Sequence, residues 1–170
     1  MLLGHSSCSR VPRGPGECLI GGHMDAIWKL AQLIGRVALG LIFLISGFGK
    51  VTAWSGSAAY AASKGVGTAL LAIATALELL GAISIVLGFK ARWGALVLLI
   101  FLVPVTLVFH NFWAVPAQEQ QSQLVNFLKN LSIAGGLLIV LGRGAGAFSI
   151  DARRSPDEAF DVARQGSGAV

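Results

Sequence analysis

The sequence predicts an all-α membrane protein, a bundle of four transmembrane helices with both chain termini in the cytoplasm. Hydrophobic residues make up 55% of the 170 residues and charged residues only 12%, about half the share typical of a soluble domain. The mean hydropathy is +0.74, and a soluble fold of this size cannot bury so much apolar surface. Four apolar runs each approach the length of about 20 residues that crosses a bilayer.

The first two apolar runs each contain one charged residue away from their ends. Residues 28–48 enclose Arg36, and residues 67–89 enclose Glu78. A charge inside a run is costly in lipid, so each of these side chains is expected to face the bundle interior. Residues 51–66, which connect the two runs, are expected to form an outer loop with a short helix along the surface.

The third and fourth runs differ in their polar content. Residues 93–113 carry no formal charge and contain Pro104, which is expected to kink the helix because proline removes a backbone hydrogen bond. Residues 124–141 contain Lys129. The connection between them, residues 114–123, is rich in glutamine, and we expect a solvated outer loop.

The two ends of the chain read differently from the apolar body. Residues 1–23 resemble a degraded expression leader, and we predict a non-native or disordered segment that does not belong to the fold. The transmembrane domain is then expected to span residues 24–149. In the tail, residues 150–170, Ser155 and Pro156 have the pattern of a helix start, which predicts a short cytoplasmic helix.

Lysine and arginine near the ends of the runs predict the orientation in the membrane, because cytoplasmic flanks are enriched in these residues. The flanks assigned to the cytoplasm contain Lys29, Lys90, Arg92, Arg143, Arg153 and Arg154. The opposite side has Lys50 and Lys64 in the first loop and Glu119 in the second. The scattered basic residues fit membrane anchoring better than a nucleic-acid surface.

The three charged residues within the runs are predicted to form one ion-pair cluster. With the helix ends near Trp28, Phe89 and Leu141 taken as one plane, a rise of about 1.5 Å per residue places the three charges at similar depths. Arg36 lies about 12 Å deep, Glu78 about 16 Å and Lys129 about 18 Å. Such a cluster can lock helix register, or it can bind an anionic or electron-rich head such as a quinone ring.

Further polar residues extend this cluster toward the outer surface as a track. The same rise places Asn126 and His110 beyond the cluster, and Lys50 near the outer interface, where its side chain is expected to snorkel. Together the candidate ligand-binding residues are Arg36, Lys50, Glu78, His110, Asn126, Lys129 and Asn130.

The body of the chain lacks the usual ligands of a redox cofactor. Cys8 and Cys18 both lie in the leader, so thiolate metal sites and iron–sulfur clusters are not expected. His110 is the only histidine after residue 23, which argues against haem held by two histidines. We therefore expect no metal and no intrinsic cofactor, and the sequence has no complete catalytic constellation. Whether the protein is an enzyme stays open.

Four motifs give the chain a resemblance to the DoxX family. The first predicted helix, continued to residue 50, contains Arg36 and then Ser46-Gly47-x-x-Lys50. The second contains Glu78-x-x-Gly81. The third ends with His110-Asn111-Phe112-Trp113, and the fourth has Phe127-x-Lys129-Asn130 followed by Gly135-Gly136. The resemblance covers residues 30–142. It implies a small four-helix inner-membrane protein of a family named after a subunit associated with quinol oxidation and thiosulfate:quinone oxidoreduction.

The function expected from these observations is a membrane subunit or accessory protein of a quinone-linked redox system. It would lie in the lipid bilayer, bind a quinone or similar small amphiphile at the polar cluster, and work with a membrane or peripheral redox partner. Two other classes stay open: a transporter or channel for a small anion or proton, and a scaffold for a partner enzyme. The oligomeric state, including a homo-oligomer, is open as well.

The orientation gives a direct prediction. Because Glu119 is assigned to the outer side, Glu119→Cys should react in intact cells with a thiol reagent that cannot cross the membrane. Labelling is measured against an Arg92→Cys control on the cytoplasmic side, which should react only after the cells are permeabilised. Protection of the Glu119→Cys thiol in intact cells would contradict the orientation.

Overall fold

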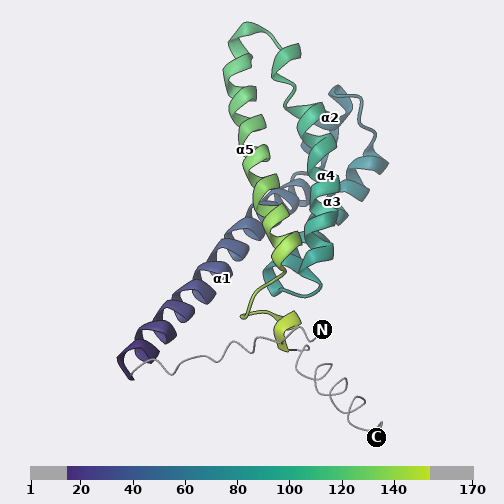
Figure 1. The fold of residues 1–170 in the computed structure, drawn as a ribbon. Helices are drawn as coiled ribbons and strands as arrows, with labels where there is room; N and C mark the ends of the chain where they lie inside the picture. The colour runs from purple at the N-terminus through teal and green to yellow at the C-terminus, as the bar shows by residue number, and fades with distance from the viewer. Residues whose placement is uncertain (1–14, 154–170) are drawn as a thin grey trace, which may run out of the picture.

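A computed structural model describes residues 15–153 of the chain. These residues form five α-helices and one short 3-10 helix, and no strand occurs among them (Figure 1). In chain order the elements are α1 Pro15–Thr52, α2 Trp54–Ser63, α3 Thr68–Leu87, α4 Ala91–Phe109, η1 Phe112–Ala114 and α5 Ala117–Arg143.

Four of the helical segments are long and apolar enough to cross a membrane, which confirms the predicted all-α, multi-pass architecture. Their bounds are Ala26–Thr52, Thr68–Leu87, Ala91–Ala114 and Ala117–Arg143. Many large apolar side chains on them face outward; Ile45 is 71% exposed and Trp93 68%. So much outward-facing apolar surface is typical of helices that lipid surrounds.

The connections between the spans differ partly from expectation. The short helix predicted between the first two spans is present as α2, and its Ala61 is buried. The prediction of a solvated loop over residues 114–123 is wrong from residue 117 onward, because α5 already begins at Ala117. Alanine, glutamine and glutamate all favour helix, and Glu119 in the first turn complements the helix dipole. α4 continues as one helix past Pro104.

The expected end segments lie largely beyond the described chain. Residues 1–14 of the predicted leader and the helix predicted at Ser155 are outside the described residues, while residues 15–23 belong to α1. After α5 the chain becomes helical again at Ile150. Ser149 caps this start, since its hydroxyl accepts a hydrogen bond of 3.1 Å from the Ala152 N–H.

α3 and α4 form a tight antiparallel pair because glycines let their backbones approach. A Cβ added at Gly81 would lie 2.7 Å from Leu98 Cγ, and one added at Gly94 would lie 2.5 Å from Ser84 Oγ. The pair is joined by a sharp turn in which Gly88 has a φ of 67°, a left-handed conformation that glycine adopts without strain.

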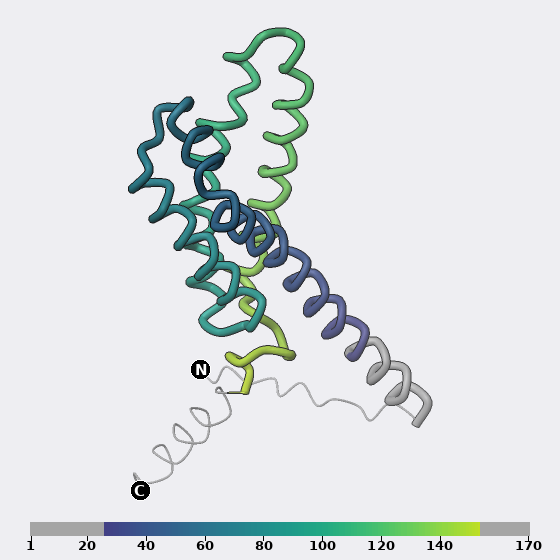
Figure 2. The backbone as a smooth tube through the Cα atoms, turned by 180° about the vertical axis from the view of Figure 1, so that it is seen from behind, coloured from purple at the N-terminus to yellow at the C-terminus, as the bar shows by residue number. Residues whose placement is uncertain are grey.

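α1 runs antiparallel to α3 and crosses α5 obliquely. Its glycines set the contact with α3, where Gly40 lies against Val86 and Gly47 against Leu79. Against α5 the approach is at Gly136, where an added Cβ would lie 3.2 Å from Leu39 Cδ1. α1 and α5 separate on both sides of this crossing (Figure 2). The start of α1, the α3–α4 turn and the segment after α5 all lie at one end of the bundle (Figure 1).

The α3–α4 contact predicts that replacing two glycines by alanine has different effects on stability. Gly81→Ala should destabilise the protein by about 1–3 kcal/mol, because the added methyl group overpacks against Leu98, which is fully buried. Gly135→Ala is the matched control, since a Cβ there meets nothing within 4 Å. Thermal unfolding in detergent measures both. Equal melting temperatures for Gly81→Ala and wild type would contradict the close packing.

Candidate functional site

The buried Glu78 forms an ion pair with the half-buried Lys50 inside the membrane-spanning region. The Glu78 side chain is 2% exposed, and its Oε2 lies 2.7 Å from Lys50 Nζ. Lys50 Nζ also donates a hydrogen bond of 2.8 Å to Ser46 Oγ. Gly47 brings α1 close to α3 beside the pair, because a Cβ there would lie 2.6 Å from Leu79 Cδ2. A carboxylate in an apolar bundle needs such a partner.

The predicted cluster of Glu78 with Arg36 and Lys129 is therefore wrong, as is the expectation that Lys50 snorkels to the interface. The depth estimate placed Trp28 level with Phe89. In the structure Arg36 is the residue beside the α3–α4 turn, since a Cβ added at Gly88 would lie 2.7 Å from Arg36 Nη1. α1 is thus displaced along its axis by about seven residues, or about 10 Å, from the assumed register.

Arg36 ties α1 to the segment that follows α5. Its side chain is 4% exposed. Nη1 donates a hydrogen bond to the carbonyl of Ala145, and Nη2 donates one of 2.6 Å to the carbonyl of Phe148. The same segment is fixed to the α3–α4 turn by Asp151, whose carboxylate accepts hydrogen bonds from the N–H groups of Lys90 and Ala91 at 2.8 and 3.1 Å.

Lys129 projects from α5 as an exposed cation. Its Nζ donates a hydrogen bond of 2.9 Å to Asn126 Oδ1, and among the described residues it forms no ion pair. Lys129 precedes Gly136 by seven residues, so both lie on nearly the same face of α5. Since Gly136 contacts Leu39 of α1, Lys129 lies on the α1 side of α5, beyond the helix crossing.

The remaining predicted site residues join α4 to α5. Asn130 Nδ2 donates a hydrogen bond of 3.0 Å to Thr106 Oγ1 within the buried interface. His110 Nδ1 lies 2.9 Å from Gln123 Oε1. No hydrogen bond in the described part of the chain links these pairs to Lys129 or to Glu78. The predicted continuous polar track is thus divided into separate local pairs.

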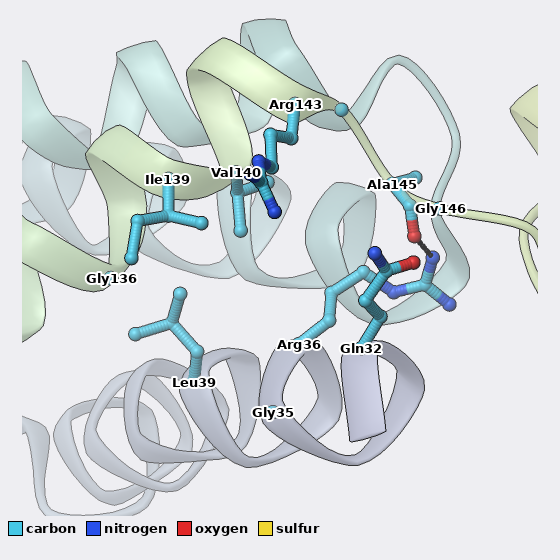
Figure 3. A pocket seen from close by; sticks show the side chains of 11 residues that line it. Gln32, Gly35, Arg36, Leu39, Gly136, Ile139, Val140, Arg143, Ala145 and Gly146 are labelled. Atoms are coloured by element: carbon cyan, nitrogen blue, oxygen red, sulfur yellow. Dashed lines mark hydrogen bonds between the residues drawn. The ribbon is translucent and has the colours of Figure 1, made fainter. Parts of the chain in front are cut away.

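A second polar region lies at the opposite end of the bundle, in a pocket of about 290 Å³ between α1 and α5. Arg36 and Gln32 line it from the α1 side and Arg143 from the α5 side (Figure 3). Sequence reasoning missed Gln32, Arg143 and Asp151. The sequence does contain a feature that could have singled out Asp151. It is the only acidic residue between Glu119 and Asp157, and it lies within a basic flank.

The described residues offer little for a metal ion, because no three histidine, cysteine, aspartate or glutamate side chains gather among them. Their polar groups are better suited to binding the oxygen atoms of a ligand. Lys129 and the arginines of the pocket are hydrogen-bond donors, which recognise carbonyl, carboxylate or phosphate oxygens.

Comparison with known proteins agrees with this architecture. The family model described as DoxX matches residues 31–111. The chain is 38% identical over 123 residues to inner membrane protein YphA of Escherichia coli (strain K12), covering 71% of this chain and 88% of that protein. It is 34% identical over 128 residues to inner membrane protein YqjF of the same organism, covering 75% and 95%.

A more distant similarity reaches eukaryotic proteins. The Surfeit locus protein 4 homolog of Schizosaccharomyces pombe is 36% identical over 72 residues, which is 41% of this chain and 24% of that protein. No solved structure is significantly similar to the chain. The family match, the two E. coli relatives and the four membrane-spanning helices lead to one assignment: the chain is a multi-pass inner-membrane protein that belongs to the DoxX family.

Proposed function

We propose that this DoxX-family protein binds a quinone or a similar small amphiphile within the membrane, as a subunit or accessory protein of a quinone-linked redox system. The observation that carries the proposal is Lys129, an exposed cation inside a membrane-spanning helix. Exposed charge at such a position is costly in lipid, and intramembrane ionisable residues are commonly functional for that reason. A ligand with hydrogen-bond acceptors offsets this cost.

Lys129 has the donors that a quinone head requires. An ammonium group carries three N–H donors, and Asn126 Oδ1 accepts one of them. The others can bind a quinone carbonyl oxygen, and the charge strengthens that bond. The reduced, anionic forms of a quinone gain more from the same charge. Lys129 is thus suited to hold the head, while the apolar helix surfaces accommodate the tail.

The charge balance of this half of the bundle supports the same conclusion. The charge of Lys50 is compensated by Glu78 through their ion pair, whereas Lys129 is bonded to the neutral amide of Asn126. A net positive charge therefore stays on the face of α5 that carries Lys129. The redox role itself is supported by the DoxX resemblance, which implies association with quinol oxidation.

Equilibrium binding of short-chain quinones to the purified protein in detergent tests the proposal. Lys129→Met keeps the side-chain length and removes the charge. Its affinity should fall by about tenfold, since a hydrogen bond to a charged group contributes about 1.5–3 kcal/mol. Lys64→Met is the matched control, because Lys64 is an exposed lysine outside the four membrane spans, and its affinity should equal that of wild type.

Two results would overturn the proposal. One is the absence of binding by folded wild type across ubiquinone, menaquinone and naphthoquinone analogues. The other is equal affinity of Lys129→Met and wild type. The first result favours transport or scaffolding as the function, and the second places the ligand elsewhere in the bundle.

A further inference from the structure

We propose that the pocket between α1 and α5, at the end of the bundle that holds the α3–α4 turn, binds the phosphate group of an anionic amphiphile. This Arg36 pocket is lined by Gln32, Gly35, Arg36 and Leu39 of α1, and by Ile139 and Arg143 of α5 among others. It is distinct from the Lys129 position, because the crossing of α1 and α5 at Leu39 and Gly136 lies between them.

The strongest observation is that the Arg36 guanidinium is buried with only neutral hydrogen-bond partners. The side chain is 4% exposed, and its two hydrogen bonds go to neutral carbonyl groups. Its Nε is buried and has no hydrogen-bond partner. Within the described region no carboxylate lies at ion-pair distance from Arg36, and Asp151 acts on its charge only from farther away. A buried donor and a buried charge both require an acceptor, and an anion in the pocket supplies it.

A second arginine faces the same space. Arg143, in the last turn of α5, is exposed, and its side chain turns toward the pocket opposite Arg36 (Figure 3). The Gln32 side chain lies beside Arg36 and adds an amide donor (Figure 3). Arginine binds phosphate through paired N–H groups, and two arginines on opposite walls can hold one phosphate between them.

The charge around the pocket favours an anion as well. Lys90 and Arg92 lie nearby, and the Arg92 side chain approaches Gly144 of the pocket wall, where an added Cβ would lie 3.4 Å from Arg92 Nε. Asp151, an acidic residue beside the pocket, has both carboxylate oxygens bonded to the N–H groups of Lys90 and Ala91. Basic clusters at a membrane surface attract anionic lipid heads.

The polarity of the lining changes along the helices, which indicates an amphiphile. Gln32, Arg36 and Arg143 lie toward the end of the bundle, whereas Leu39 and Ile139 lie closer to the crossing. A phosphate among the arginines thus places an attached acyl chain along the apolar residues. A free phosphate ion satisfies the arginines alone, so the experiment compares the two sources.

The test uses purified full-length protein in detergent, with bound ligand counted by native mass spectrometry. The probes are dihexanoyl phosphatidylglycerol, dihexanoylglycerol of the same chain length, and inorganic phosphate. Phosphatidylglycerol should bind at least about tenfold more tightly than dihexanoylglycerol, because only the former carries the group that the arginines recognise. If inorganic phosphate displaces it fully and binds as tightly, the site takes free phosphate.

Two pairs of variants locate the site. Gly35→Leu fills the pocket, since Gly35 lines it and a Cβ there meets nothing within 4 Å; binding should be lost while the melting temperature is kept. Gly49→Leu is its control on the same helix, equally free of contacts but outside the pocket. Arg143→Gln should weaken binding by about tenfold, and Arg92→Gln, which does not line this pocket, by less than about twofold.

Each outcome decides the proposal. Loss of phosphatidylglycerol binding in Gly35→Leu and Arg143→Gln, with wild-type binding in both controls, supports it. Equal binding of phosphatidylglycerol and dihexanoylglycerol, or unchanged binding in folded Gly35→Leu, overturns it. Because these probes contain no quinone and Lys129 is untouched, failure here leaves the proposed quinone site unaffected.

Discussion

The ion pair between Lys50 and Glu78 fixes how α1 lies against the other helices. Glu78 is the acidic residue of the α3 span, and it is almost completely buried. An unpaired charge at the centre of a membrane helix costs about 2.5 kcal/mol or more, so α1 must present its cation at the level of Glu78. The small Gly47 lets the two helices approach closely enough for the 2.7 Å contact.

This register determines the positions of the other polar groups. Arg36 precedes Lys50 by fourteen residues, which is about 21 Å along a helix, and this distance brings Arg36 to the α3–α4 turn. There its guanidinium binds the carbonyl groups of Ala145 and Phe148. The oblique course of α1 leaves the Arg36 pocket on one side of the α1–α5 crossing and Lys129 on the other. The two proposed sites thus follow from one helix placement.

The sequence predicted the spans well and the partners of the charges poorly. Length and hydropathy locate membrane helices because lipid requires about 20 apolar residues, and the four motifs led to the DoxX family. The predicted depths, however, depend on the assumption that the helix ends near Trp28, Phe89 and Leu141 share one plane. α1 extends past that plane, so Lys50, and not Arg36, lies at the level of Glu78. Lys129 is on α5, which crosses α1 obliquely, so a similar depth does not bring it to Glu78. Offset and tilt depend on packing at Gly40 and Gly47, which hydropathy does not report.

A double-mutant cycle on Lys50 and Glu78 tests the central claim most directly. The free energy of unfolding is measured in mixtures of mild detergent and dodecyl sulfate for Lys50→Met, Glu78→Gln and the double variant. A second cycle, which pairs Lys129→Met with Glu78→Gln, serves as the reference. The account predicts a coupling energy of about 1–3 kcal/mol between Lys50 and Glu78 and additive effects for Lys129 and Glu78. Additive effects in the first cycle, or coupling of that size in the second, would contradict the placement of α1.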